Sequence, residues 1–309
     1  MPEPNDTNNW GGFAGVEGPA AEAEPDASAD GSVYTAVGND ERARRANTFP
    51  FYALQQFPTR VNGAMSSNGN TMSGGCSGAK VGPRAVLTAS HCVYNPLTGA
   101  WTTSGFFNPG QTNTTTPNGS HAWAGVYARD YIANGRQDDY AVFFVNDSSA
   151  FYNLGWLGIG WSTDPAFYSG MNAKNRGYPC GPNLGCGMIS TQRCADSARS
   201  DLRCDGWMYG MDIPLPSDAF WPNNLLAYHN DVSFGHSGSA IYDNNSAVLG
   251  IVTHQESQPG CNSNNVPPCP WYLPCHGPRF RQAMWDDVCS WIADPNFQSA
   301  HGQHPICHW

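Results

Sequence analysis

The stretch Gly235-His236-Ser237-Gly238-Ser239 is the most informative part of this 309-residue chain. A serine flanked by glycines can stand clear of its own backbone, with its hydroxyl open to a reacting carbonyl. Neighbouring backbone amides then face the same carbonyl oxygen and can stabilise the charge that it acquires. The stretch is therefore compatible with Ser237 as a nucleophile, but on its own it is weak evidence, because Ser-Gly pairs occur in ordinary loops.

Two further motifs precede this serine in the chain. Residues 87–92 read LTASHC and residues 138–142 read DDYAV, so His91 and Asp139 each stand at the boundary of a short apolar run. Histidine, carboxylate and serine in this order match one of the known orders of a catalytic triad. Taken singly, each motif is better explained by structure, with His91 as a packed core residue and the aspartates as a turn cap. All three motifs together, in this order, favour a catalytic site over a purely structural role.

With these three motifs, the chain from about Pro50 to Ile292 resembles the chymotrypsin-fold serine endopeptidases, and among them the bacterial glutamyl endopeptidase (V8-like) branch. The resemblance implies an all-β fold of two antiparallel six-stranded β-barrels with a C-terminal helix and a site in the crevice between them. The expected division of the chain is an acidic leader and propeptide at 1–45, barrels at 46–150 and 151–293, and a tail at 294–309.

The resemblance also implies a role for each motif residue. Ser237 attacks the scissile carbonyl, and His91 accepts its proton as general base, because a serine hydroxyl is a weak nucleophile near neutral pH. Asp139, directly before the apolar run, holds the imidazole and stabilises the imidazolium. The backbone N–H groups of Gly235 and Ser237 bind the oxyanion. No metal or organic cofactor is needed for this chemistry.

Composition agrees with a β-rich enzyme. The chain has 34 Gly, 24 Pro and 13% charged residues, which is typical of short strands joined by turns. No apolar run approaches the roughly 18 residues of a membrane helix. A net charge of −10 without a basic block argues against nucleic acid as a partner. We expect a monomer that acts on protein or peptide substrates, without membrane contact.

Periodicity places the expected elements along the chain. Apolar residues recur at helical spacing over residues 279–292, which predicts the terminal helix. Short apolar runs bounded by turn residues predict the strands. For the first barrel these are 51–57, 76–89, 122–128 and 140–145, and for the second 156–161, 187–191, 206–213, 239–242 and 247–254.

The chain has eleven cysteines, which indicates an oxidising compartment and secretion from the cell. The resemblance implies that Cys76 pairs with Cys92 across the loop that carries His91. The other cysteines form two sets whose pairing the sequence leaves open. They are Cys180, Cys186, Cys194 and Cys204, and then Cys261, Cys269, Cys275, Cys289 and Cys307. The odd total leaves one thiol unpaired or intermolecular.

The leader carries most of the net negative charge of the chain. Residues 1–45 hold nine acidic residues and three arginines and show little apolar periodicity, so we expect weak order. The run Arg42-Ala43-Arg44-Arg45 predicts a processing site with a mature chain from about Ala46, although a charged linker explains it too. Position 236 is His rather than the aspartate of animal trypsin-like zymogens, so activation through a new N-terminal salt bridge is not available.

Specificity rests on two walls of the substrate pocket. Asp231 stands where trypsin-like enzymes keep the carboxylate for basic P1 side chains, but glutamyl endopeptidases also have an aspartate near there as a structural acceptor. The strand over residues 250–254 is expected to form the opposite wall with Thr253 and His254. Val252 occupies the place of the glutamate-binding histidine of that branch. Val252 and His254 share a strand face, so His254 can still reach the pocket mouth.

Two other functions are compatible with the sequence. The tail gathers His301, His304, Cys307 and His308 within eight residues and suits a transition metal, although its spacing matches no known metal motif. A disulfide at Cys307 with solvated histidines explains the tail better, so we expect no metal site there. The second alternative is a catalytically inert homologue that acts as an extracellular binding module. Loss of a triad residue would favour it, and none is lost.

Overall fold

The computed structural model describes thirteen segments of the chain. They are 10–12, 16–17, 43–44, 55–66, 75–95, 99–102, 104–112, 115–178, 208–215, 219–221, 224–228, 235–255 and 275–302. The expected strand at 187–191, Asp231 and seven of the nine cysteines whose pairing the sequence leaves open lie outside them. Within them, no helix is long and apolar enough to cross a bilayer.

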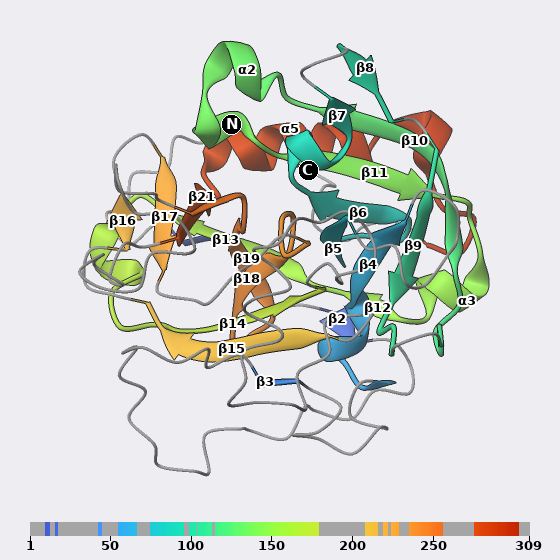
Figure 1. The fold of residues 1–309 in the computed structure, drawn as a ribbon, viewed down its shortest axis with the longest axis horizontal. Coiled ribbons are helices and arrows are strands. Elements are labelled where there is room, and N and C mark those ends of the chain that lie inside the picture. The colour runs from blue at the N-terminus through green and yellow to red at the C-terminus, as the bar shows by residue number, and fades with distance from the viewer. Residues whose placement is uncertain are drawn as a thin grey trace, which may run out of the picture.

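Six antiparallel strands close into a barrel in the first half of the chain (Figure 1). Their order around the barrel is β10-β11-β6-β5-β4-β9. The strands are β4 (Asn62–Ser66), β5 (Cys76–Lys80), β6 (Ala85–Thr88), β9 (Phe106–Pro109), β10 (His121–Ala128) and β11 (Ala141–Val145). A hairpin of β7 (Tyr94–Asn95) and β8 (Ala100–Trp101) follows β6. Residues 55–57 form turns, so the expected strand at 51–57 is wrong there.

The apolar run of β11 shows why these strands pack on both faces. Phe143 lies on one side, where its ring stacks on Trp123 at 4.4 Å and meets Phe107 edge-on at 5.8 Å. Phe144 points to the other side and stacks on Phe297, beyond the C-terminal helix, at 4.4 Å. Successive strand residues face opposite ways. Both faces are covered, and all five residues of β11 are buried.

Apart from β12, the described strands of the second half lie in two sheets. The larger has the order β1-β13-β19-β18-β14-β15-β3 and the smaller β16-β17-β21-β20. A bridge between Gly250 and Arg279 links them. The strands of this half are β12 (Gly155–Trp156), β13 (Gly158–Ser162), β14 (Asn172–Gly177), β15 (Tyr209–Pro214), β16 (Phe220–Trp221), β17 (Leu225–Tyr228), β18 (Ala240–Asp243), β19 (Ala247–Ile251), β20 (His254–Gln255) and β21 (Cys275–Pro278). The all-β class is thus confirmed. Among the described residues the first barrel is closed, and the larger sheet of the second half includes one parallel pairing, of β13 with β19.

Three short strands of the leader pair with the body of the protein. Strand β1 (Trp10–Gly12) pairs with β13 and β3 (Ala43–Arg44) with β15, at opposite edges of the larger sheet. Strand β2 (Val16–Glu17) pairs with β12. The backbone of the expected processing site therefore takes part in a sheet edge. The division of the chain at residue 45 stays a prediction.

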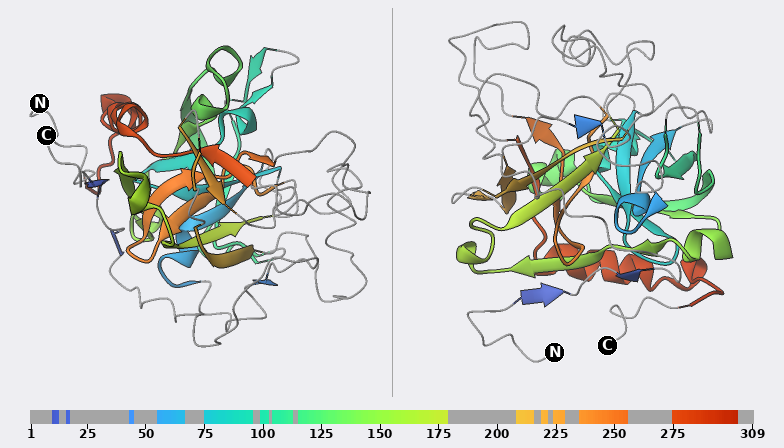
Figure 2. Two further views of the ribbon diagram at one scale, coloured as in Figure 1. Left: turned by 90° about the vertical axis from the view of Figure 1, so that its left-hand side faces the viewer. Right: turned by 90° about the horizontal axis from the view of Figure 1, so that it is seen from below.

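The expected C-terminal helix is confirmed as α5 (Gln282–Ile292). It lies outside the strands on one side of the molecule (Figure 2). Its buried side recurs at helical spacing through Met284, Trp285, Val288 and Ile292. The other helical turns are α2 (Tyr131–Asn134) and α3 (Ser149–Tyr152), and the 3₁₀ turns η3 (Thr59–Val61), η4 (Ser90–Cys92), η5 (Arg136–Asp138), η6 (Pro165–Phe167) and η8 (Pro295–Phe297).

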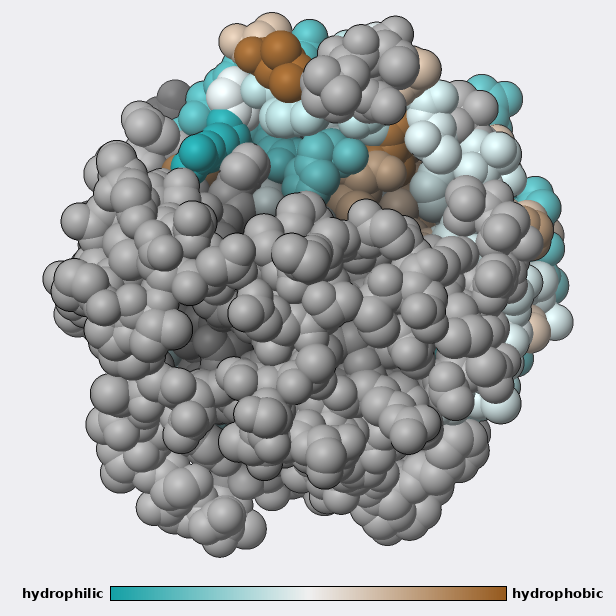
Figure 3. All heavy atoms as spheres, in the orientation of Figure 1, coloured by the Kyte–Doolittle hydropathy of each residue, from teal (hydrophilic) through white to brown (hydrophobic). Residues whose placement is uncertain are grey.

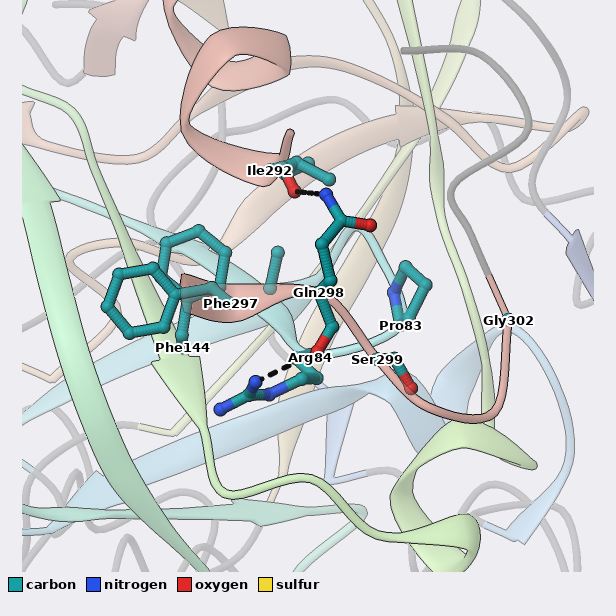
Figure 4. A pocket seen from close by; sticks show the side chains of 9 residues that line it. Pro83, Arg84, Phe144, Ile292, Phe297, Gln298, Ser299 and Gly302 are labelled. Atoms are coloured by element: carbon teal, nitrogen blue, oxygen red, sulfur yellow. Dashed lines mark hydrogen bonds between the residues drawn. The ribbon is translucent and has the colours of Figure 1, made fainter. Parts of the chain in front are cut away.

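After α5 the chain returns over the first barrel around a small pocket (Figure 4). Arg84 donates to the carbonyl oxygen of Gln298 at 3.0 Å, and the side chain of Gln298 donates to Ile292 O at 3.3 Å. Asp147 accepts from Ser299 Oγ at 2.8 Å and Ala300 N at 2.7 Å. These bonds lower the pKa of the Asp147 carboxyl although partial burial opposes them. The segment thus closes one side of the barrel.

Strand β5 of the first barrel ends in a fully buried lysine, Lys80. Lys80 Nζ donates to Gly155 O at 2.7 Å and lies 4.7 Å from the ring centres of both Phe151 and Trp156. Aromatic faces and a carbonyl oxygen stabilise a cation without neutralising it. Burial, and then the charge of Arg60, hold the pKa of Lys80 well below its usual 10.5.

We therefore expect the free energy of unfolding to rise with pH through Lys80. Between the folded pKa and 10.5, the unfolded lysine binds a proton that the folded lysine has lost, so alkali favours the native state. The slope approaches about 1.4 kcal/mol per pH unit in that window. Urea unfolding at increasing pH should show a flatter curve for Lys80→Met than for Lys174→Met, which changes the other lysine of the chain. Parallel curves would contradict the assignment.

Candidate active site

The loop after β6 and the turn before β11 bring His91 and Asp139 together. His91 stands in η4, and Asp139 follows η5. Asp139 Oδ2 lies 2.7 Å from His91 Nδ1, and Asp139 Oδ1 accepts from the backbone N–H of His91 at 2.9 Å. The carboxylate is fully buried, while the imidazole remains 27% exposed. The two carboxylate oxygens therefore fix both the ring and the backbone of His91.

The neighbouring aspartate has a different partner. Asp138 Oδ1 lies 2.5 Å from Arg281, the residue directly before α5, which also donates to Gln137 O at 3.0 Å. This ion pair joins the turn before β11 to the start of α5. Of the two adjacent carboxylates, Asp139 is the one that contacts the histidine.

A second ion pair, between Arg129 and Asp287, joins the segment after β10 to α5. Asp287 accepts two bonds from the Arg129 guanidinium at 2.6 and 2.5 Å and a further bond from the Tyr140 hydroxyl. Ser90 Oγ donates to Arg129 O at 2.6 Å, directly beside His91. Burial and the bond to Asp287 raise the pKa of Tyr140. The Asp287 carboxylate raises the pKa of Arg129. This network ties the residues beside His91 and Asp139 to one helix.

The serine stretch forms a tight turn between the two halves of the protein. Gly235 and Gly238 have φ values of +94° and +84°, a region that glycine adopts without strain. Gly238 N donates to Val252 O at 2.7 Å, and Ser77 N donates to Ser237 O at 2.8 Å. Ser237 is partly exposed, whereas the flanking residues are buried. The turn presents the serine at the surface, as its sequence predicts.

The expected disulfide between Cys76 and Cys92 is confirmed. Its Cys92 Sγ lies 3.6 Å from Ser237 O and within 4.8 Å of a ring nitrogen of His91. The serine turn and the histidine loop therefore adjoin the same bridge. The structure thus places Ser237 beside the bridge that also adjoins His91, although the two residues lie far apart in the chain.

The disulfide also bears on whether the residues around it could bind a metal ion. Among the described residues, Cys76, His91 and Cys92 form the one set of three metal-ligating residue types found close together. Thiolates are the form in which cysteine binds metals, and these two sulfurs are joined to each other instead. The set is better explained as a disulfide beside a histidine. In the tail, His301 is exposed, and the other three residues lie outside the described part.

The expected specificity residues are described only in part. Thr253 is buried, and His254 pairs in register with His276 between β20 and β21. Asp231 lies outside the described segments. Beside His91, the Tyr131 ring stands edge-on at 6.3 Å. The next residue of α2, Ile132, is 58% exposed. Figure 3 shows a compact hydrophobic group at the top of the molecule, where Figure 1 places α2.

Sequence reasoning missed the residues that support the site from a distance. Arg281 and Ser77 contact the site loops through bonds that span 143 and 158 residues of sequence. Neither belongs to a recognisable motif, because an arginine before a helix and a serine in a strand are commonplace. The helical pattern of residues 279–292 predicted α5, but it gave no sign that Arg281 contacts the turn before β11.

Comparison with characterised proteins agrees with this geometry. The family model described as Trypsin matches residues 50–270, more than half of the chain. A glutamyl endopeptidase of Bacillus licheniformis is 23% identical over 280 residues, which cover 88% of this chain and 73% of that protein. An extracellular metalloprotease of Bacillus subtilis is 25% identical over 221 residues, which cover 70% of this chain and 64% of that protein.

Solved structures show the same similarity. A Glu endopeptidase in complex with MPD superposes with a TM-score of 0.60 at 25% identity, covering 82% of this chain and 97% of the other. The protease Anisep from Arthrobacter nicotinovorans gives a TM-score of 0.51 at 18% identity, covering 74% and 93%, which shows the fold alone. From its family match, its fold and its similarity to glutamyl endopeptidases, the chain belongs to the trypsin family and is a serine endopeptidase.

Proposed function

We propose that this endopeptidase cleaves extracellular proteins or peptides with Ser237 as nucleophile, His91 as general base and Asp139 as the residue that holds the imidazole. The observation that carries the proposal is the double contact of Asp139 with His91, at 2.7 Å to the ring and 2.9 Å to the backbone. A fully buried carboxylate with both oxygens on one histidine suits a base that must keep one orientation through catalysis.

The chemistry follows from this orientation. With the Nδ1 proton directed at Asp139, Nε2 keeps its lone pair and accepts the proton of the Ser237 hydroxyl as the oxygen attacks the carbonyl carbon. The tetrahedral oxyanion receives hydrogen bonds from the backbone amides of Gly235 and Ser237. His91 then returns the proton to the leaving amine, which leaves an acyl-enzyme. Water releases the acyl group by the same steps.

The strand after the serine turn forms one wall of the substrate pocket in this proposal. Gly238 N donates to Val252 O at 2.7 Å, and Val252 N donates to Ser239 O at 2.9 Å. These bonds support a place for Thr253 and His254 directly beside the nucleophile. Asp231 forms the facing wall, as a site for a basic P1 side chain or as an acceptor that braces its loop.

Export from the cell is the second part of the proposal. Disulfides persist in oxidising compartments, and Cys76, Cys92 and Cys289 are all disulfide-bonded. The leader would be removed after Arg45, and its strands would leave the sheet edges when the mature enzyme forms. Because β3 pairs with β15, removal of the leader must also break this edge pairing.

The test is labelling with a fluorophosphonate, which reacts with an activated serine. The full chain and the chain cut after Arg45 are labelled, digested and mapped by mass spectrometry. We expect the label on the peptide that contains Ser237, none in Ser237→Ala, and retained labelling in Ser239→Ala, the matched control in the same turn. A folded protein that takes no label in either form would instead support the inert binding homologue.

A further inference from the structure

A buried hydroxyl lies directly behind the serine turn. Ser77 is the second residue of β5, next to the Cys76 bridge, and it is fully buried. Burial of a hydroxyl is unfavourable unless it is hydrogen-bonded. Ser77 Oγ donates to Gly235 O at 2.6 Å and accepts from Tyr178 N at 2.8 Å. Both roles of the hydroxyl are therefore used.

The backbone of Ser77 contacts the same turn. Its N–H donates to Ser237 O at 2.8 Å, and its carbonyl oxygen accepts from Thr88 Oγ1 at 2.8 Å. One residue of the first barrel thus binds the carbonyl groups of Gly235 and Ser237. These are the two residues whose amides donate to the oxyanion in the function proposed above.

The Gly235 contact matters because glycine turns easily about its own backbone bonds. Gly235 has φ +94° and no Cβ to restrict it, so rotation of the adjoining peptides costs little. The bond from Ser77 Oγ fixes the carbonyl on one side of Gly235. That constraint limits the directions in which the Gly235 amide, on the other side of the same Cα, can point.

We propose that Ser77 is a positioning residue of the oxyanion hole, which holds Gly235 and Ser237 so that their amides converge before substrate arrives. The inference rests on the proposed function of these two amides. Ser77 touches neither substrate nor the reacting atoms. It acts by keeping the donors preorganised, and preorganised donors contribute most where charge develops in the transition state.

The experiment compares Ser77→Ala with the wild-type chain in its active form. Loss of a direct oxyanion donor costs about 10²–10³-fold in kcat, and loss of its support should cost about tenfold. KM should stay within about twofold, because the oxyanion forms only after substrate binds. Affinity for a peptide aldehyde, which forms a tetrahedral adduct with the serine, should fall in the same proportion as kcat.

The controls separate positioning from stability. Ser162→Ala removes another buried serine hydroxyl, which accepts from Asp164 N far from the turn, and should lower the melting temperature with kcat unchanged. Ser77→Thr keeps a hydroxyl and should recover most of kcat. If Ser77→Ala does not fold, Ser77→Cys replaces it, because a thiol is a weak donor and should also lower kcat.

The outcomes are distinct. Wild-type kcat and aldehyde affinity in folded Ser77→Ala or Ser77→Cys would overturn the role of Ser77, while labelling of Ser237 in the wild type would still support the proposed function. A rise in KM with kcat unchanged would also overturn it. Absence of label in the wild type would remove the proposed function itself.

Discussion

Asp139→Asn is expected to lower kcat by about 10⁴-fold while the fold survives. Asparagine has nearly the same shape as aspartate but carries an NH₂ group. Asp139 faces two N–H groups of His91, at 2.7 Å and 2.9 Å, and an amide has only one acceptor oxygen for them. When the NH₂ group faces Nδ1, the ring must carry its proton on Nε2, which then cannot accept from Ser237. The measurement is kcat on a peptide substrate with folding checked by circular dichroism.

Asp138→Asn is the matched control, one residue earlier in the same turn. Its carboxylate binds Arg281 rather than His91, and both side chains of that pair are partly exposed. The asparagine keeps an acceptor oxygen for Arg281, which also donates to Gln137 O at 3.0 Å, so the turn should hold and kcat should fall by less than about tenfold. Similar large losses in both variants would show that the turn as a whole, not the Asp139 carboxylate, is what catalysis requires.

Gly238→Ala is expected to destabilise the protein by about 3 kcal/mol or more and to reduce labelling of Ser237 severely. A Cβ at Gly238 would lie 2.1 Å from Thr88 Oγ1 and 2.3 Å from Ser77 O, and φ is +84°. Relief of these contacts must move the serine turn away from the first barrel. Displacement of a reacting group by about 1 Å can cost about 10²-fold in rate. Urea unfolding and the labelling rate measure the two effects.

Gly170→Ala is the corresponding control. Gly170 has φ +69°, and no other heavy atom lies within 4 Å of a Cβ built there. This variant has the backbone strain without the collision and should cost about 1–2 kcal/mol with unchanged labelling. If Gly238→Ala behaved like Gly170→Ala, the close approach of β5 and the serine turn would not matter to the site.

Local sequence was sufficient where the physical cause is local. The helical spacing of apolar residues over 279–292 predicted α5, and the glycines around Ser237 predicted a turn that the positive φ values at Gly235 and Gly238 show. Cys76 and Cys92 were paired by resemblance, and their disulfide is confirmed. The strand expected at 51–57 failed at residues 55–57, because an apolar run alone does not distinguish a strand from a turn packed on the core.

Resemblance placed the three site residues in order, and their catalytic roles stay a prediction. The tertiary structure decided which of the two adjacent carboxylates contacts His91 and which contacts Arg281. Asp138 and Asp139 are adjacent and chemically alike, but closure of the barrel and docking of α5 direct one to Arg281 and the other to His91. It also decided that Ser77 lies behind Gly235.

The sequence by itself determined the turns, the terminal helix and the residue types that chemistry needs, because backbone preference and apolar periodicity act over a few residues. Only the tertiary structure decided how those residues are held. Hydrogen bonds between positions more than a hundred residues apart, such as Ser77 to Gly235, depend on how the two halves of the chain pack against each other. No short-range pattern in the sequence records that packing.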